Sequence, residues 1–268
     1  MLFSNIKQRK QKEKLLAWAV NVRSNEPINN QIDIEDFCAY DNLYELRNEK
    51  GEFLARNYIE NMFGKIEAEV GSVLKKINEK SQDGKYLKCT SVLSEYDKSI
   101  LIILMTMLQF RDPETINYGI KILQHDNPKI NEREARNFTL MNLLPLGVDS
   151  EWDENTIIRT AVKKYFGMEF QIGVTSDDLI ITSDRPVVEW PPDENELFNR
   201  PQAVMFPLTS KLVLNLFPIL NTQQMGRSFF YVLNEGQIRD VQINVTSCAR
   251  RWIFSRNAIT NEQLEIIK

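Results

Sequence analysis

The chain has 268 residues, of which 43% are hydrophobic and 26% are charged, and both values are typical of a globular protein. Its formal net charge of -4 argues against a general polyanion-binding protein, so a role with nucleic acid would need a local basic patch. The three cysteines, Cys38, Cys89 and Cys248, are far apart and odd in number, which argues against a zinc ribbon and against a disulfide framework. We therefore expect free thiols and a cytoplasmic protein.

The sequence also bears on membranes. The longest apolar run, Ile100 to Leu108, is too short for the roughly 20 residues that a membrane span needs. The N-terminus lacks the apolar segment of a signal peptide. Its basic residues from Lys7 to Lys14 are typical of a solvated tail, although they can also contact nucleic acid.

The first predicted elements are a strand, a hairpin and a long helix. Leu15 to Val20 reads as the strand, and a short hairpin is expected to turn at residues 48–51. Asn57 is a candidate N-cap for the helix, and Glu60 stands in the capping-box position. Apolar residues then recur at three- and four-residue spacing and form one stripe: Ile59, Met62, Phe63, Ile66, Val70, Val73, Leu74 and Ile77.

Further helices fill the middle of the chain. Ser94 is expected to cap a helix that runs to about Phe110 and stops before Pro113. We expect the apolar stripe of the first helix to pack against this one. Three more helices are predicted, over 114–124, over 132–144, and from Asp153 or Asn155 to Phe166.

From Gly167 the pattern is mainly that of strands. Residues 168–174 and 179–182 predict a β-hairpin, and residues 187–190 predict another strand. A strand pair is expected at 203–208 and 212–217. The last predicted elements are a helix around Val241, a strand at 251–254 and a helix at 259–267. The order predicts a single α+β domain over 1–268. In it, a helical middle (57–166) packs against a mostly antiparallel sheet formed by strands of the N-terminal (1–56) and C-terminal (167–268) parts.

Several short segments, in order, carry a family resemblance. They are Asn42 to Leu46, Asn57 to Glu67, Gln109 to Pro113, Ser183 to Val188, Phe206 to Thr209 and Cys248 to Phe254. Together they resemble the bacterial family called domain of unknown function 4238, or DUF4238. The resemblance spans about Asp41 to Asn257 and implies no established reaction.

One feature of that family is not matched. Its members usually open with a His-His-Tyr-x-Pro segment ahead of a Leu…Phe-Ser pair. Phe3 and Ser4 fall where that pair ends, so we expect this chain to lack the histidine segment and any activity that needs it; the alternative is that the histidines come from sequence not included in this chain. The only histidine, His125, lies in a predicted loop that does not match the motif.

The candidate catalytic residues are carboxylates and a lysine. Glu60 and Glu67 lie on one helix, and together with Asp184 and Lys211 they can form a Mg²⁺-dependent site. The structural alternatives are a capping box for Glu60 and an ion pair at the helix edge for Glu67. Asp184 can instead cap a turn by accepting hydrogen bonds from nearby backbone N–H groups.

The candidate binding residues are Arg111, Ser183 and Thr209. Arg111 can clamp a phosphate or carboxylate, satisfy the last carbonyls of its helix, or pair with Asp184. We expect Arg111 and Asp184 to approach each other, directly or through one turn, and so to join the helical middle to the C-terminal sheet.

Two functions remain open. The sequence contains no GxSxG, Walker A or dinucleotide fingerprint. The first function is a non-catalytic interaction or regulatory protein that binds another protein and needs no cofactor, linked to bacterial defence or mobile elements by analogy with the family. The alternative is a Mg²⁺-dependent nuclease-like enzyme. Oxygens of Glu67 and Asp184 within reach of one metal ion would favour the enzyme.

Overall fold

The computed structural model describes residues 16–24, 26–27, 31–33, 43–54, 57–143, 163–165, 167–192, 200–221 and 225–267. The basic segment from Lys7 to Lys14, Cys38 and most of the helix expected from Asp153 or Asn155 lie outside these residues. Cys89 and Cys248 are free thiols. Within the described ranges, no helix combines the length and apolar character required to cross a membrane.

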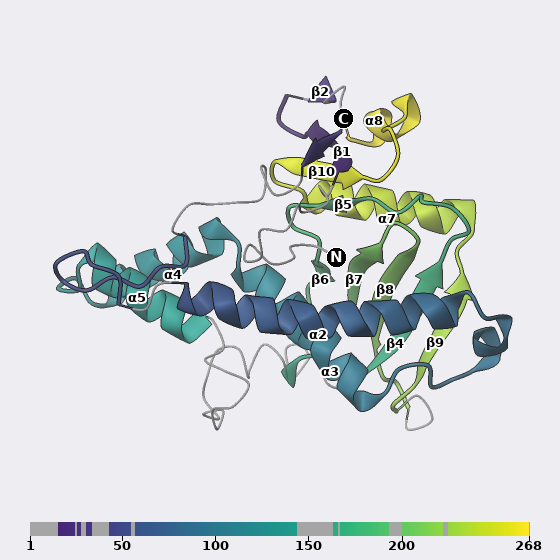
Figure 1. Cartoon of the computed structure of the whole chain (residues 1–268), viewed down its shortest axis with the longest axis horizontal. Helices are drawn as coiled ribbons and strands as arrows, with labels where there is room; N and C mark the ends of the chain where they lie inside the picture. The colour runs from purple at the N-terminus through teal and green to yellow at the C-terminus, as the bar shows by residue number, and fades with distance from the viewer. Residues whose placement is uncertain are drawn as a thin grey trace, which may run out of the picture.

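The described residues form two sheets of five strands each, and the larger one, which has the longer strands, has the order β6-β7-β8-β4-β9 (Figure 1). Its strand β4 pairs with β8 in antiparallel and with β9 in parallel orientation. The strands are β4 (Met168–Val174), β6 (Val188–Trp190), β7 (Ala203–Thr209), β8 (Leu212–Pro218) and β9 (Ser228–Val232). The predicted pair β7 and β8 is confirmed.

The predicted hairpin between 168–174 and 179–182 is wrong. Strand β4 lies between two other strands of the larger sheet, whereas Thr182–Ser183 forms β5 in the smaller one. Met168, Glu169 and Phe170 are buried in succession, as expected for a central strand covered on both faces. The turn residues after β4 therefore lead out of the larger sheet instead of back along it.

The smaller sheet joins the two ends of the chain. β1 (Leu16–Asn21) pairs in antiparallel orientation with β10 (Trp252–Ser255), and Val20 stands opposite Ile253. The other strands are β2 (Glu26–Pro27) and β3 (Ile32–Asp33), which pair with β1, and β5, which pairs with β10. The α+β class is thus confirmed, but the N-terminal strands enter only this smaller sheet.

Helices α2 (Tyr58–Ser81) and α3 (Glu95–Phe110) cover one face of the larger sheet (Figure 1). The expected stripe of α2 is buried at Phe63, Ile66, Val70 and Val73 and partly buried at Leu74. It shares one core with α3 and with the inner face of the strands. The predicted packing of these two helices is confirmed.

The opposite face of the larger sheet is covered by α7 (Glu235–Cys248). Val241 and Val245 of α7 share a second core with Val213 of the larger sheet and Ile253 of the smaller one. Helix α7 therefore lies between the two sheets (Figure 1). The last helix, α8 (Asn261–Ile267), packs against α7.

Helices α4 (Pro113–Asp126) and α5 (Glu132–Leu143) form an antiparallel pair that extends away from the sheets (Figure 1). The predicted tight turn lies beside α5: Gly51 has a φ of 82° and its N–H donates to the Asn48 carbonyl at 2.9 Å. Arg47 and Asn137 exchange two hydrogen bonds, of 3.2 and 2.6 Å, that hold the turn segment on α5.

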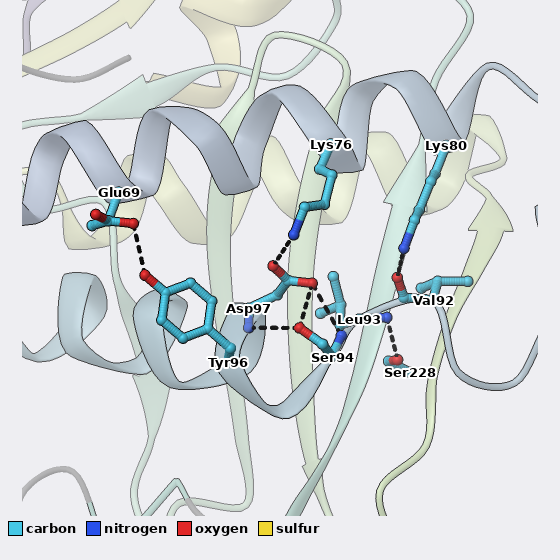
Figure 2. Close-up of polar contacts among 9 residues, drawn as sticks. All are labelled: Glu69, Lys76, Lys80, Val92, Leu93, Ser94, Tyr96, Asp97 and Ser228. Carbon is cyan, nitrogen blue, oxygen red and sulfur yellow. Dashed lines mark hydrogen bonds and ion pairs between the residues drawn. The ribbon is translucent and has the colours of Figure 1, made fainter.

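The start of α3 is fixed by polar contacts with α2 and β9, which Figure 2 shows. Ser94 and Asp97 form a capping box, which confirms the predicted cap. Lys76 of α2 lies 2.7 Å from Asp97, and the Leu93 N–H donates to the buried Ser228 Oγ at 2.8 Å. A 3₁₀ helix, η1 (Gly84–Lys88), occupies the connection between α2 and α3.

Candidate functional site

The candidate site is built around the junction of α3 and α4. Pro113 starts α4 at a position where its missing N–H costs nothing, and Asp112 caps the helix by accepting from the Glu114 N–H at 3.4 Å. Arg111 is the C-cap of α3. Since the chain turns here, Gln109, Arg111 and Asp112 contact different elements.

Arg111 binds to α2. Its Nη1 lies 3.2 Å from Glu67 Oε1 and its Nη2 lies 3.9 Å from Glu60 Oε2. The guanidinium also stacks over the rings of Phe63 and Tyr44, at 4.8 and 5.6 Å from their centroids. The Tyr44 hydroxyl donates to the Arg111 carbonyl at 2.7 Å. We call these five residues the Arg111 cluster.

Glu60 is free to reach Arg111 because the expected capping box does not form. Asn57 is in the left-handed conformation, with a φ of 57°, and its side chain makes no capping hydrogen bond. Its N–H donates instead to the carboxylate of Glu45, at 3.1 and 3.2 Å. Glu45 thus takes the role that the sequence pattern gave to Glu60.

The carboxyl group of Glu67 has a pKa above its ordinary value. Burial raises its pKa to about 7, against the opposing effect of Arg111 and with a further increase from Glu60. The side chain remains 19% exposed, so solvent can reach it. Burial also raises the pKa of Tyr44, which therefore stays a neutral donor. A carboxyl that titrates near neutral pH can donate or accept a proton.

Asp112 connects α4 to the C-terminal part of the chain. Its Oδ2 lies 3.3 Å from Arg250 Nη1 and 3.7 Å from Arg185 Nη2. Arg250 also pairs with Glu114. The Asp112 side chain is 11% exposed and that of Arg250 29%, so this ion pair is partly buried.

Asp184 has the contacts of a turn cap. Its carboxylate accepts from the backbone N–H groups of Arg250, at 3.0 Å, and Arg251, at 2.9 Å. Its own N–H donates to the Trp252 carbonyl at 3.0 Å. Ser183 Oγ accepts from the Arg185 N–H at 3.2 Å. Asp184 is therefore linked to the Arg111 cluster through two contacts: its carboxylate binds the Arg250 N–H, and the Arg250 guanidinium pairs with Asp112, the residue that follows Arg111.

Thr209 and Lys211 lie in a different place, since Thr209 is the last residue of β7 and Lys211 lies in the turn that leads to β8. The Lys211 N–H donates to Thr209 Oγ1 at 3.1 Å, and the Lys211 ammonium donates to the Ser176 carbonyl at 2.8 Å. The structure thus brings Glu60, Glu67 and Arg111 together. It joins Ser183 and Asp184 to them through the arginines and places Thr209 and Lys211 in a separate turn.

Sequence reasoning missed several polar residues of this region. Tyr165 is fully buried, and its hydroxyl lies 2.8 Å from Gln109 Oε1 and contacts Glu189, which pairs with Lys164 at 2.8 Å. Gln109 lies, like Tyr44, Asp112 and Arg250, inside a segment that resembles the family. Their position in a family-like segment is the signal by which the sequence could indicate these residues, but it does not show which residues they contact.

The candidate carboxylates have protein partners of two kinds, an ion pair for Glu67 and backbone hydrogen bonds for Asp184. Glu67 faces a guanidinium and Asp184 faces two N–H groups. Over the residues that the structure describes, no group of three or more His, Cys, Asp or Glu side chains is arranged to hold a metal ion.

Fold and site define an α+β protein in which ion pairs at the α3–α4 junction join a helical region to segments that border the smaller sheet. A family model described as a protein of unknown function, DUF4238, matches residues 3–258, so the chain belongs to that family. The resemblance carried by the short segments is thereby confirmed. Comparison of the chain with curated proteins and with solved structures gave no match.

Proposed function

We propose that this chain is a non-catalytic interaction or regulatory protein that acts by binding another protein and needs no cofactor. The supporting observation is that the candidate catalytic side chains are engaged by internal partners. Asp184 accepts two backbone N–H groups, Glu67 pairs with Arg111, and the Lys211 ammonium binds the Ser176 carbonyl. Each contact joins separate segments of the chain, so a structural role accounts for these residues without a substrate.

The test has two parts. Purified protein is incubated with single- and double-stranded DNA and RNA in the presence of Mg²⁺ or Mn²⁺, and we expect no cleavage beyond that of Asp184→Asn and Glu67→Gln. Cross-linking in a bacterial host that carries the gene should then recover a partner protein whose complex re-forms from purified components. Metal-dependent cleavage that both substitutions abolish would contradict the proposal.

The alternative function is a Mg²⁺-dependent nuclease-like enzyme that uses Glu60, Glu67, Asp184 and Lys211. One observation favours it: Glu60 and Glu67 meet at Arg111, and Glu60 remains 40% exposed. Under this alternative Mg²⁺ is the cofactor, and the basic residues from Lys7 to Lys14 are the expected contact with nucleic acid. The cleavage assay above distinguishes the two functions.

The same proposal places the protein in the cytoplasm of a bacterium, in a defence or mobile-element system, by analogy with the family. Its test is the plating efficiency of a panel of phages on bacteria with and without the gene. A protective effect that survives Glu67→Gln would support a binding role, because binding does not need a titrating carboxyl.

A further inference from the structure

The side of the larger sheet that faces α7 is only partly covered by that helix. Val213 of β8 lies in the second core under α7, whereas the next residues of the strand on the same side, Asn215 and Phe217, lie outside it. Phe217 is 39% exposed, and Phe229 of β9 is half-buried. Among the described residues, neither ring belongs to a hydrophobic cluster. Solvent therefore reaches the sheet beyond α7.

Two rows of side chains cross this part of the sheet, and β4 supplies the middle of each row. In the first row, Gln171 lies between Asn215 of β8 and Phe229 of β9. In the second row, Glu169 lies opposite Phe217 of β8. Neighbouring strands are about 4.8 Å apart, so the two rings stand on either side of the polar side chains of β4. With the arginine beside Glu169, the rows form a surface that we call the polar strip: Asn215, Gln171, Phe229, Phe217, Glu169 and Arg227.

Glu169 is a charged residue in an inner strand, and its side chain is only 6% exposed. Its Oε2 accepts from Gln171 Nε2 at 2.8 Å. Its Oε1 lies 3.4 Å from Arg227 Nε, but both of these atoms are buried without a hydrogen-bond partner. A buried carboxylate oxygen that accepts no hydrogen bond is costly for folding. Such an atom needs an explanation, and a bound ligand supplies one.

The remaining hydrogen-bonding groups of the strip are mostly acceptors. Because a carboxylate only accepts, the Gln171 amide presents its Nε2 to Glu169 and keeps its Oε1 as an acceptor. Asn215 Nδ2 donates to the Tyr231 hydroxyl at 2.7 Å, which leaves Asn215 Oδ1 as another acceptor. Burial raises the pKa of Tyr231, so its hydroxyl keeps a proton to donate. A ligand that satisfies these groups therefore carries N–H donors.

We propose that the polar strip binds a nucleoside phosphate. The base stacks on the exposed ring of Phe217 and donates its N–H groups to the oxygens of Glu169 and Gln171. The phosphate pairs with Arg227, whose side chain is 37% exposed and whose planar guanidinium suits phosphate oxygens. A nucleotide combines the flat ring, the N–H edge and the anion that the strip requires. The inference goes beyond the proposed function, because it adds a small ligand to a protein-binding role.

The charge of the strip favours a free nucleotide over a nucleic-acid strand. Arg227 is the only cation among the six residues, and it is shared with Glu169. Proteins that bind strands neutralise several phosphates with Lys and Arg. The formal net charge of -4 also opposes a polyanion. We therefore expect a mononucleotide to bind at least as tightly as a strand.

The experiment measures binding to the full chain by isothermal titration calorimetry. The probes are the 5′-monophosphates of the four ribonucleosides, the free nucleosides and a short single-stranded RNA, all in EDTA so that no metal-dependent cleavage contributes. We expect at least one monophosphate to bind with a Kd below about 1 mM. Its nucleoside should bind about 10-fold more weakly, because it lacks the charged group that Arg227 binds.

Two substitutions identify the strip as the site. Phe217→Ala should weaken binding by about 10-fold or more, since it removes the stacking ring. Arg227→Gln should abolish the preference for the monophosphate over the nucleoside. The matched control is Tyr118→Ala, because Tyr118 is also an exposed aromatic residue, 67% exposed on α4, and this variant should bind as the wild type does. Circular dichroism should be unchanged in all three variants.

Two results would overturn the inference: no binding of any probe up to about 1 mM, or binding that both Phe217→Ala and Arg227→Gln leave unchanged. If the RNA binds more tightly than every monophosphate and Phe217→Ala weakens it, recognition of the base is supported and a strand is its source. Failure of the nucleotide site leaves the proposed function standing, because that function is tested separately by recovery and reconstitution of a partner protein.

Discussion

At the scale of single residues, Glu67 is where burial and ion pairing act in opposite directions. Burial disfavours its charged form and Arg111, 3.2 Å away, favours it; burial dominates, so the pKa rises from 4.5 to about 7. Between these two pH values the folded protein keeps a proton that the unfolded chain has lost. The contribution of Glu67 to stability must therefore fall as the pH rises through this window.

The first prediction follows from this fall in stability with rising pH. Between pH 4.5 and 7 the wild type should lose about 1–3 kcal/mol of unfolding free energy through Glu67, since one pKa unit corresponds to about 1.4 kcal/mol. Glu67→Gln cannot ionise, so it should lack this part of the pH dependence. The measurement is denaturant unfolding of both proteins at several pH values.

Glu79→Gln on the same helix is the control. Glu79 is 65% exposed and pairs with Lys75 at 4.0 Å, a type of contact worth little. Its pH dependence should match that of the wild type. Parallel curves for the wild type and Glu67→Gln would show that burial does not control the Glu67 carboxyl.

The second prediction concerns Asp112 and Arg250, the ion pair that joins α4 to the end of α7. Asp112→Asn keeps a residue that can cap α4 but removes the charge. A double-mutant cycle with Arg250→Gln should give a coupling energy of about 1–2 kcal/mol, because the pair is only partly buried. The same cycle on the exposed pair Lys75 and Glu79 should give less than about 0.5 kcal/mol. If the two cycles agreed, the Asp112–Arg250 ion pair would contribute no more to stability than an exposed pair does.

At the scale of elements, two helical glycines predict opposite effects of the same substitution. A Cβ on Gly71 meets nothing within 4 Å, whereas one on Gly119 would lie 2.8 Å from Thr139 Cγ2. Gly71→Ala should therefore stabilise the protein by about 0.5–1 kcal/mol through helix propensity. Gly119→Ala should destabilise it by about 1–3 kcal/mol, because α4 and α5 must move apart.

A second substitution identifies the cause. Thr139→Ser removes the methyl group that Gly119→Ala would meet but keeps the hydroxyl that donates to the Ala135 carbonyl at 2.8 Å. The double variant should recover most of the lost melting temperature. Failure of Thr139→Ser to compensate would place the effect of Gly119→Ala elsewhere than in the helix contact.

The helices could be predicted from the sequence because their signals are local. The stripe of α2 and the Ser94 cap of α3 lie within a few turns of the chain they define. Strand pairing is not local, and this explains the wrong hairpin: β4 pairs with β8 and, in parallel, with β9. The run of aromatic and β-branched residues in β9, Ser228–Val232, is typical of a strand and is a local signal of this kind.

Some residues of the candidate site could be predicted from the sequence, but their distant partners could not. Glu60, Glu67 and Arg111 were identified from their positions, and the structure brings them together. Arg250 and Glu45 could not be found as partners, because the sequence contains no measure of which distant segments meet. The capping box of Glu60 failed for that reason: a carboxylate from outside the helix took the Asn57 N–H.

At the scale of the whole molecule, α7 connects the parts. Its core includes Val213 of the larger sheet and Ile253 of the smaller sheet, and Ile253 stands opposite Val20 of the first strand. Both ends of the chain therefore depend on a helix that also covers the larger sheet. An interior shared in this way is expected to unfold as one unit.

The last prediction tests that single-domain organisation. Calorimetric unfolding of the wild type should give one transition in which the calorimetric and van't Hoff enthalpies agree. Val245 of α7 is 0% exposed and lies in the core between the sheets. Val245→Ala should remove about 1–3 kcal/mol by leaving a cavity. Because both sheets share that core, the substitution should shift the whole transition to lower temperature without splitting it. A separate early transition, with loss of hydrogen-exchange protection confined to β1 and β10, would instead make the smaller sheet an independent unit.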